Sequence, residues 1–273
     1  MRFTKGHGTE NDFVIIADPD GELDLSASRV AFLCDRRGGI GADGVLRVVR
    51  TKAAEPGSVP GGGSDAEWFM DYRNADGSVA EMCGNGVRVF ARYLVDSGLA
   101  GPGTFPVATR GGDKIVTLGA EGDVSVDMGA PVIFGSSSVD VAGGTYTGRK
   151  VSMGNPHLAC RIGDPVAGLD LSVPPVFSAE DFPEGVNVEL FEPVGDRHVT
   201  MRVYERGSGE TRSCGTGAVA TAVAAALLAG SDPLTEDSEW TVDVLGGTVV
   251  VVFAGGTSHL RGPATLVADG VLR

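Results

Sequence analysis

Two cysteines stand in the same local setting, and this residue type in this setting suits proton transfer. Cys83 opens the run Cys-Gly-Asn-Gly and Cys214 opens Cys-Gly-Thr-Gly, and an apolar, helix-like segment follows each run. A thiol at a helix start lies beside unpaired N–H groups and a partial positive charge, which lower its pKa from about 8.5 into a range of roughly 3.5–7.5. The same N–H groups bind anions, and the glycines let a ligand approach the backbone closely.

A pair of such thiols suits the inversion of a carbon next to a carboxylate. One cysteine, as thiolate, removes the alpha hydrogen, and the other, as thiol, delivers a proton to the opposite face. Negative charge builds up on the carboxylate, where preorganised N–H donors stabilise it. Because one thiolate and one thiol are needed at a time, the pair titrates as a coupled unit. The two cysteines together predict racemisation or epimerisation.

The alternative for each cysteine taken alone is packing, because cysteine is often a small buried residue. The remaining cysteines, Cys34 in an apolar helical stretch and Cys160 in a strand, are predicted to be core thiols. The four cysteines have no tight zinc-ligand spacing. We expect no metal site and no structural disulfide.

Composition argues against several classes of partner. A net charge of −14 over 273 residues disfavours nucleic acid and an anionic membrane as partners. The N-terminus has no apolar run that suits a secretory signal, and the longest apolar stretch, near 218–229, is too short to span a bilayer. We therefore expect a cytoplasmic protein. None of the four lysines stands in a setting that suggests a Schiff base, so pyridoxal phosphate is not expected.

Short strands and a few helices must position the two cysteines. A helix is predicted at 26–37 with Ser26 as its N-cap, and a hairpin is predicted to turn at Gly246-Gly247. The helix from Ala218 to Leu228 is apolar nearly all round and should be buried. The last two predicted strands flank Gly154-Asn155-Pro156-His157. Strands are predicted at residues 13–17, 45–50, 68–73, 149–153 and 158–162.

These elements predict an α+β fold. Each half is mostly strand with one long helix, so we infer two pseudo-symmetric domains, each a curled, mainly antiparallel sheet around a central helix. The N-terminal domain is predicted at 1–118, joined by 262–273, and the C-terminal domain at 119–261. A run rich in Gly, Pro and Ser at 53–66 is interpreted as a mobile surface loop within the first domain.

Seven motifs follow one another along the chain. They are His7-Gly8 through Asn11-Asp12-Phe13, Tyr72 to Ser78, Cys83 to Gly86, Met153 to His157, Val186-Asn187, Arg202 to Thr211, and Cys214 to Ala218. In this order they resemble the diaminopimelate epimerase family over nearly the whole chain. The resemblance implies interconversion of LL- and meso-diaminopimelate without pyridoxal phosphate, metal or other cofactor, on the route to lysine and peptidoglycan. It also implies two α+β domains that close over a small diamino diacid substrate, and a homodimer.

The resemblance also assigns roles by position. Cys83 and Cys214 match the catalytic acid/base residues of the family. The groups that hold the reacting end match Gly84, Asn85, Gly215 and Thr216. The residues that bind substrate, largely at its distal amino-acid end, match Asn11, Asn74, Asn155, Asn187, Glu205 and Arg206. His157 and Glu205 match polar groups that tune the cysteines.

These residue types suit a second zwitterionic end, which needs acceptors for an ammonium and donors for a carboxylate. Amide side chains supply both, and Arg206 can hold a carboxylate through two parallel hydrogen bonds. Asn74 and Asn155 stand beside Gly or Pro, where a turn role is frequent, and the two roles can coexist. For His157 the alternative is a satisfied structural histidine.

The chain departs from the family pattern at two places. Thr9-Glu10 stand where many members have Leu-Gly, and Gly44 stands where some members have a glutamine that contacts substrate. Gly44 is therefore left out of the predicted site.

Two other functions remain open from the sequence. A proline or hydroxyproline racemase of the same fold would share the cysteine pair but lack the polar grip on a distal end. A non-catalytic binding protein, or a redox switch in which the two cysteines form a disulfide, would differ in its response to Cys→Ser substitution or to oxidation.

Overall fold

The computed structural model describes residues 1–61 and 63–273, and the chain folds as two compact units. The N-terminal unit comprises Met1–Val126 and Gly262–Arg273, and the C-terminal unit comprises Asp127–Arg261. Both are built mainly of antiparallel strands with a long helix, so the predicted α+β class is confirmed. The predicted end of the first domain at 118 falls one strand earlier than the end of the N-terminal unit, and the division into functional domains stays a prediction.

A five-stranded sheet forms the base of the N-terminal unit, in the order β18-β1-β2-β3-β4. Only β2 and β3 are parallel, and the other neighbours are antiparallel. Its strands are β1 (Arg2–Gly8), β2 (Asn11–Ala17), β3 (Gly44–Arg50), β4 (Trp68–Asn74) and β18 (Thr265–Val271). The remaining elements are α1 (Ala27–Cys34), the single turn η1 (Thr51–Ala53), α2 (Gly84–Asp96), β5 (Gly103–Val107), β6 (Lys114–Leu118) and β7 (Val124–Gly129), the last of which crosses the unit boundary.

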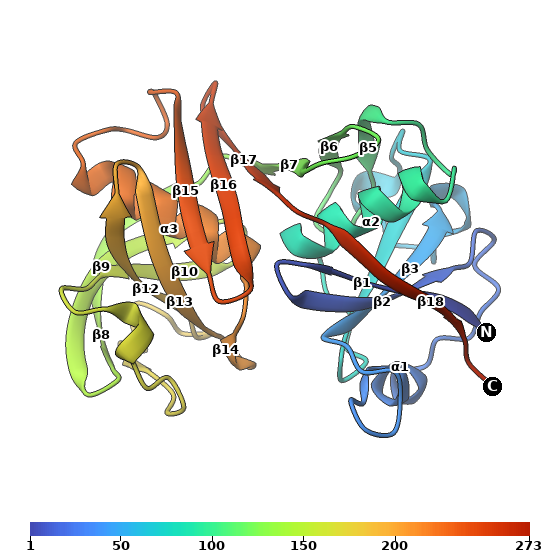
Figure 1. Cartoon of the computed structure of the whole chain (residues 1–273), viewed down its shortest axis with the longest axis horizontal. Coiled ribbons are helices and arrows are strands. Elements are labelled where there is room, and N and C mark those ends of the chain that lie inside the picture. The colour runs from blue at the N-terminus through green and yellow to red at the C-terminus, as the bar shows by residue number, and fades with distance from the viewer. The chain divides into compact units, whose positions relative to one another are not determined.

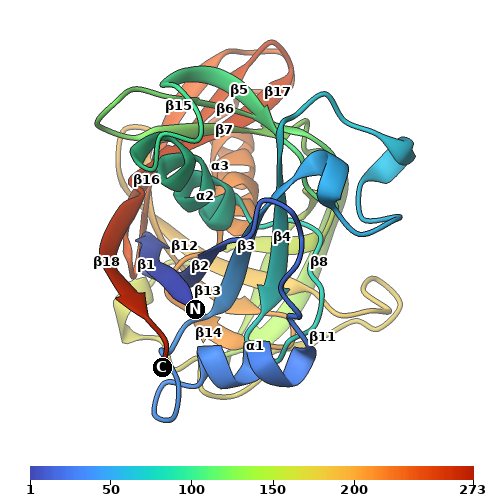
Figure 2. The same cartoon turned by 90° about the vertical axis from the view of Figure 1, so that its right-hand side faces the viewer.

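Helix α2 fills the core of the N-terminal unit. It packs against β1, β2, β3, β4, β6 and β18, as can be followed in Figure 2. Val89, Phe90 and Leu94 are fully buried, and burial of side chains of this size stabilises the fold by roughly 1.5–3 kcal/mol each. The same helix also buries Arg88 and Arg92, which is unusual for charged residues.

The C-terminal unit is built on one sheet in the order β11-β8-β9-β10-β12-β13-β15-β16-β17, with β14 on β13. The pairs β10–β12 and β13–β15 are parallel, and the other pairs are antiparallel. The first strands are β8 (Val132–Val141), β9 (Gly144–Ser152), β10 (Pro156–Arg161), β11 (Val176–Phe177) and β12 (Asn187–Gly195). The others are β13 (His198–Glu205), β14 (Gly209–Thr211), β15 (Ser238–Val244), β16 (Gly247–Ala254) and β17 (Thr257–Gly262), with the turn η3 (Val166–Gly168) and helix α3 (Gly215–Leu228).

Helix α3 is the central element of the C-terminal unit. It packs against β9, β10, β12, β13, β15 and β16, which surround it in Figure 1. Its small apolar residues are buried as far as Ala226, which confirms the predicted burial of this helix. Leu228 at its end is 54% exposed.

Three local predictions need correction. The first helix ends at Cys34 and not at 37, because the Asp35 carboxylate accepts the N–H groups of Arg37 and Gly38 and turns the chain. The hairpin predicted at Gly246-Gly247 pairs Val244 with Gly247, so the turn lies one residue earlier. His157, placed between strands by the sequence, lies inside β10 and is fully buried.

No helix in the described part of the chain combines the length and the hydropathy that a membrane crossing requires.

Candidate active site

Cys83 is the N-cap residue of α2. Its backbone is extended, with φ −141° and ψ 119°, and the Gly86 N–H donates to its Sγ at 3.4 Å. The thiol in turn donates to Asn11 Oδ1 at 3.5 Å. The half-buried sulfur therefore has an acceptor that suits the thiol form and a helix-start donor that suits the thiolate.

Asn11 joins the first β-hairpin to the start of α2. Asn85 Nδ2 donates to its Oδ1 at 3.3 Å, and its own Nδ2 donates to Asp43 Oδ2 at 2.8 Å. Next to it, Asp12 is paired with Arg36 and Lys5. Burial raises the pKa of Asp12, but the hydrogen bonds from the two cations outweigh that effect and lower it to about 2. An ionised, charge-paired carboxylate thus anchors the hairpin that carries Asn11.

Arg88 lies in the same helix and has no counterpart in the sequence-based site. Its side chain is completely buried; Nη2 donates to Thr9 Oγ1 at 3.3 Å and Nε donates to Pro263 O at 3.4 Å. Among the described residues, Nη1 has no hydrogen-bond partner. Burial lowers the pKa of Arg88 to about 10, and the charges of Cys83 and Asp123 oppose that shift. A guanidinium buried in this way favours a negative charge on Cys83.

Asn74 acts as a turn residue at the end of β4. Its side chain donates to Ser78 Oγ at 3.0 Å, and its backbone N–H donates to Ser78 O at 2.9 Å. Gly44 lies opposite it in the β3–β4 ladder. A Cβ added at Gly44 would stand 2.6 Å from Arg73 O and 2.7 Å from the Tyr72 ring, so this backbone leaves no room for the glutamine of other family members.

Cys214 caps α3 in the same way, with φ −123° and ψ 115°, but its surroundings differ. It is only 6% exposed. Burial raises its pKa well above the usual value and the charge of Glu205 raises it further, while hydrogen bonds with Thr216 and Gly217 oppose the shift. The expectation of a lowered pKa is therefore wrong at this position, because desolvation and the nearby acid outweigh the donors of the helix start.

A chain of side chains runs from the sheet to Cys214. Thr216 Oγ1 lies 3.6 Å from Cys214 Sγ, and Asn155 Nδ2 donates to that hydroxyl at 3.4 Å. Asn155 Oδ1 lies 3.1 Å from His157 Nε2, and His157 Nδ1 lies 2.7 Å from Glu189 Oε1. The structure thus brings together four residues predicted from the sequence and adds a fifth, Glu189.

Glu189 was missed by the sequence analysis, although a signal for it exists. It stands two residues after Asn187 on β12, and residues i and i+2 of a strand share a face. A glutamate on the same strand face as a predicted site residue, between apolar neighbours, is a site candidate.

Asn187 and Arg206 are brought together at the edge of the C-terminal unit. Asn187 Nδ2 donates to Pro156 O at 3.0 Å, and its Oδ1 accepts the backbone N–H of Arg206 at 2.9 Å. The exposed guanidinium of Arg206 donates to Glu184 O at 3.1 Å. Glu205, the last residue of β13, accepts a short hydrogen bond from the Thr211 hydroxyl. Asn187 thereby positions the backbone of Arg206.

Cys34 and Cys160 are buried among apolar side chains, as predicted for core thiols. Burial raises the pKa of Cys34 to about 11 and that of Cys160 to about 12. Neither contacts a predicted site residue through a hydrogen bond among the described residues, and both are unreactive thiols at neutral pH.

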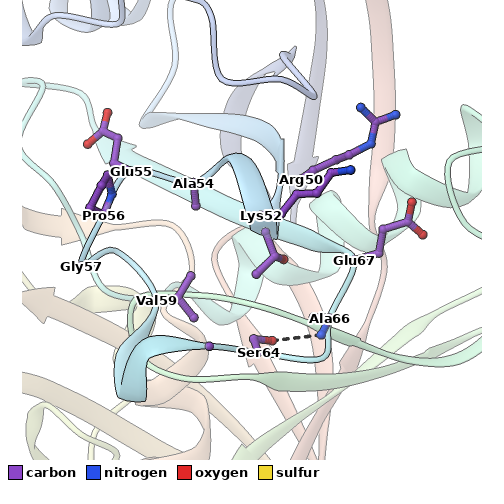
Figure 3. Close-up of a pocket in the computed structure, with 12 residues that line it drawn as sticks. Arg50, Lys52, Ala54, Glu55, Pro56, Gly57, Val59, Ser64, Ala66 and Glu67 are labelled. Atoms are coloured by element: carbon purple, nitrogen blue, oxygen red, sulfur yellow. Dashed lines mark hydrogen bonds between the residues drawn. The ribbon is translucent and has the colours of Figure 1, made fainter.

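A separate cavity of about 540 Å³ lies under the loop after β3 (Figure 3). Arg50, Glu55, Pro56, Val59 and Glu67 are among the residues that line it. None of the predicted site residues lines this cavity, so it carries no part of the site.

Comparison with known proteins gives the family. The family model for diaminopimelate epimerase matches residues 3–134 and 149–267. The diaminopimelate epimerase of Thermobifida fusca is 59% identical over 276 residues, which cover 100% of this chain and 98% of the relative. The diaminopimelate epimerase of Streptomyces coelicolor is 54% identical and covers 99% of this chain and 94% of the relative.

Solved structures show a similar fold at low identity. A probable proline racemase from Agrobacterium radiobacter K84 has a TM-score of 0.65 at 14% identity and covers 100% of this chain and 92% of that one. A hydroxyproline epimerase from Agrobacterium vitis has a TM-score of 0.64 at 15% identity, with coverage of 99% and 91%. At this identity the likeness shows the fold alone. The full-length match to the close relatives decides the assignment: the chain belongs to the diaminopimelate epimerase family and is an epimerase.

Proposed function

We propose that this epimerase converts LL-2,6-diaminopimelate to the meso form by moving an alpha proton between Cys83 and Cys214. Relatives that match the whole chain at 59% and 54% identity carry the name of that activity. The observation that carries the mechanism is the repeated cysteine setting. Each unit offers one cysteine as the N-cap of its central helix, with amide side chains beside it.

In the proposed reaction one sulfur removes the alpha proton as a thiolate, and the other supplies a proton as a thiol. Cys214 is the thiol in the free enzyme, because burial and the charge of Glu205 raise its pKa. Cys83, with a helix-start donor and the Arg88 charge, is the better thiolate. The N–H groups at both helix starts would stabilise the negative charge that develops on the substrate carboxylate.

We assign the reacting end of the substrate to the two helix starts, through Gly84, Asn85, Gly215 and Thr216. The distal amino-acid end is assigned to Asn11, Asn74, Asn155, Asn187, Glu205 and Arg206. Asparagine amides supply donors and acceptors for a zwitterion, and Arg206 supplies a charged donor for its carboxylate. His157 and Glu205 are assigned to tuning Cys214, since Glu205 raises the pKa of that thiol.

The setting proposed for this activity is a cytoplasmic homodimer that uses no cofactor and no metal, and binds neither nucleic acid nor membrane. The net charge of −14 supports the last two points. Size-exclusion chromatography with light scattering tests the dimer, and an absorbance spectrum tests for pyridoxal phosphate.

The deciding experiment is a stereochemical assay of the purified protein. LL-diaminopimelate should yield the meso form on chiral separation, and in deuterium oxide the alpha position should gain one solvent deuterium for each inversion. L-Proline and trans-4-hydroxy-L-proline serve as the rival substrates, because solved structures with a similar fold bear those names. Inversion of either proline substrate with no turnover of diaminopimelate would overturn the proposed substrate.

A further inference from the structure

Glu189 and His157 form a buried pair behind Cys214, and the hydrogen bonds around them fix where the protons lie. Both side chains are fully buried, and Glu189 Oε1 lies 2.7 Å from His157 Nδ1. A Cβ added at Gly217 would stand 2.7 Å from the same Glu189 oxygen and 3.3 Å from Cys214 Sγ. The pair therefore lies directly against the first turn of α3, with the reactive sulfur.

The direction of the chain follows from Asn155. Its Nδ2 donates to Thr216, so its Oδ1 must act as the acceptor toward His157 Nε2. His157 Nε2 consequently carries a hydrogen. Between His157 Nδ1 and Glu189 Oε1 one proton is shared, and it belongs either to the imidazole, as an ion pair, or to the carboxyl, as a neutral pair.

Burial favours the neutral pair. Glu189 Oε2 has no hydrogen-bond partner among the described residues, and a bare carboxylate oxygen in that position would be costly. Burial is also the largest effect on the Glu189 carboxyl and raises its pKa, against the influence of His157. The other ionisable groups around the pair are Glu205, Cys160 and Cys214, each of which carries no charge or a negative one.

We propose that Glu189 is a positioning residue that stays protonated, donates to His157 Nδ1, and so orients a row of donors toward Cys214. His157 Nε2–H then points to Asn155, Asn155 Nδ2–H to Thr216, and the Thr216 hydroxyl hydrogen to Cys214 Sγ. The row stabilises the sulfur after it has released its proton, and a neutral Glu189 adds no negative charge beside the new thiolate. This inference rests on the proposed acid/base role of Cys214.

Nitrogen-15 NMR of histidine-labelled protein tests the proton positions directly. The chain has four histidines, and loss of one signal set in His157→Gln assigns the residue. In the resting wild-type protein we expect a protonated Nε2 and an unprotonated Nδ1 at neutral pH. Two protonated nitrogens, or the opposite tautomer, would overturn the inference, whatever the substrate proves to be.

Kinetics of two Glu189 variants test its effect on turnover. A Glu189→Gln side chain still has an N–H group for Nδ1, so kcat should stay within about threefold of wild type. Glu189→Leu has no donor, and kcat should fall by about tenfold or more with a smaller change in KM. Glu192→Gln is the matched control, because this glutamate lies on the same strand and accepts the Val166 N–H at 2.9 Å, away from Cys214.

The outcomes separate the two proposals. If Glu189→Gln loses as much activity as a folded Glu189→Leu, a carboxylate is required and the protonated-donor role is wrong. If Glu189→Leu does not fold, the wild-type spectrum and the Glu189→Gln kinetics still decide. A wild-type protein that does not epimerise diaminopimelate contradicts the proposed function, while the tautomer measurement on the resting protein remains valid.

Discussion

The helices that begin at Cys83 and Cys214 have the same N-cap geometry, but different ionisable groups lie around them. Both cysteines are N-caps with an extended backbone, and each is followed by Gly-X-Gly. Five residues after Cys83 stands Arg88, a buried cation; five residues after Cys214 stands Val219, which is buried and apolar. Beneath the second helix lie His157 and Glu189 in place of a cation.

A helix start supplies donors but does not alone decide the charge of the thiol it carries. At Cys214 desolvation and the charge of Glu205 raise the pKa, although the helix start would lower it. At Cys83 the sulfur is less buried, accepts a backbone N–H, and interacts with the Arg88 charge. The proposed two-base inversion uses this asymmetry, with Cys83 as the thiolate and Cys214 as the thiol in the free enzyme.

Removal of either sulfur should lower the rate of inversion more than any other change predicted here. Cys83→Ser and Cys214→Ser should each lower kcat for inversion by about 10³ or more, because a serine hydroxyl is a far poorer base than a thiolate. Chiral separation of the products measures the loss. Cys34→Ala is the control, since this buried thiol lies in another cluster and should keep full activity. Substantial turnover in either serine variant would contradict the two-base mechanism.

The second prediction concerns Arg88, the buried cation whose charge interacts with Cys83. Arg88→Met should lower kcat by about tenfold, because Cys83 loses a positive charge that favours its thiolate. Loss of the hydrogen bonds to Thr9 Oγ1 and Pro263 O should also lower the free energy of unfolding by about 1–3 kcal/mol, so kcat is measured on the folded variant.

Arg92→Met is the matched control on the same helix. Arg92 donates to the carbonyls of Gly119, Ala120 and Gly122, so its loss should cost about 2–3 kcal/mol of stability with a smaller effect on kcat. Urea unfolding and steady-state kinetics on both variants give the two readouts. Equal losses of activity in the two variants would contradict the proposal that the Arg88 charge favours the Cys83 thiolate.

A third prediction concerns the pH dependence of thiol reactivity. A raised pKa leaves little thiolate at neutral pH, so alkylation of Cys214 by iodoacetamide should be slow and should still be accelerating with pH at about pH 9. Cys83 should react at least about ten times faster at pH 8. Mass spectrometry of the digested protein measures both rates in one sample. Equal rates for the two cysteines across this range would mean that their surroundings do not differentiate them.

The smallest predicted effect is on stability at alkaline pH, and it comes from the buried thiol of Cys34. Its folded pKa of about 11 lies above the ordinary value of 9.0, so the folded state holds its proton more tightly than the unfolded state. Stability from this group is complete below pH 9 and is lost as pH rises toward 11, by about 1 kcal/mol at pH 10. Cys34→Ala should reduce this alkaline loss in chemical unfolding. An unchanged slope between pH 9 and 11 would assign the loss to other groups.

Much of the fold could be predicted from local patterns. The apolar run of α3 required burial whatever surrounded it, and the apolar and β-branched residues of β3 and the strand-like run of β4 marked their strands. The end of the first helix could not be read, because it depends on a side-chain bond of Asp35. His157 could not be placed either: its strand is defined by pairing with β12, where it faces Asn187.

Residue types at short fixed spacings were enough to predict the two thiols, their helix starts and the family resemblance. The groups that surround each thiol depend on the tertiary structure. Glu189 reaches Cys214 because β12 runs beside β10 and both support the first turn of α3, and Arg88 is buried because β1 and β18 cover α2. Such contacts join residues far apart in the chain, and the resulting burial and charge control proton affinity in a way that no local spacing records.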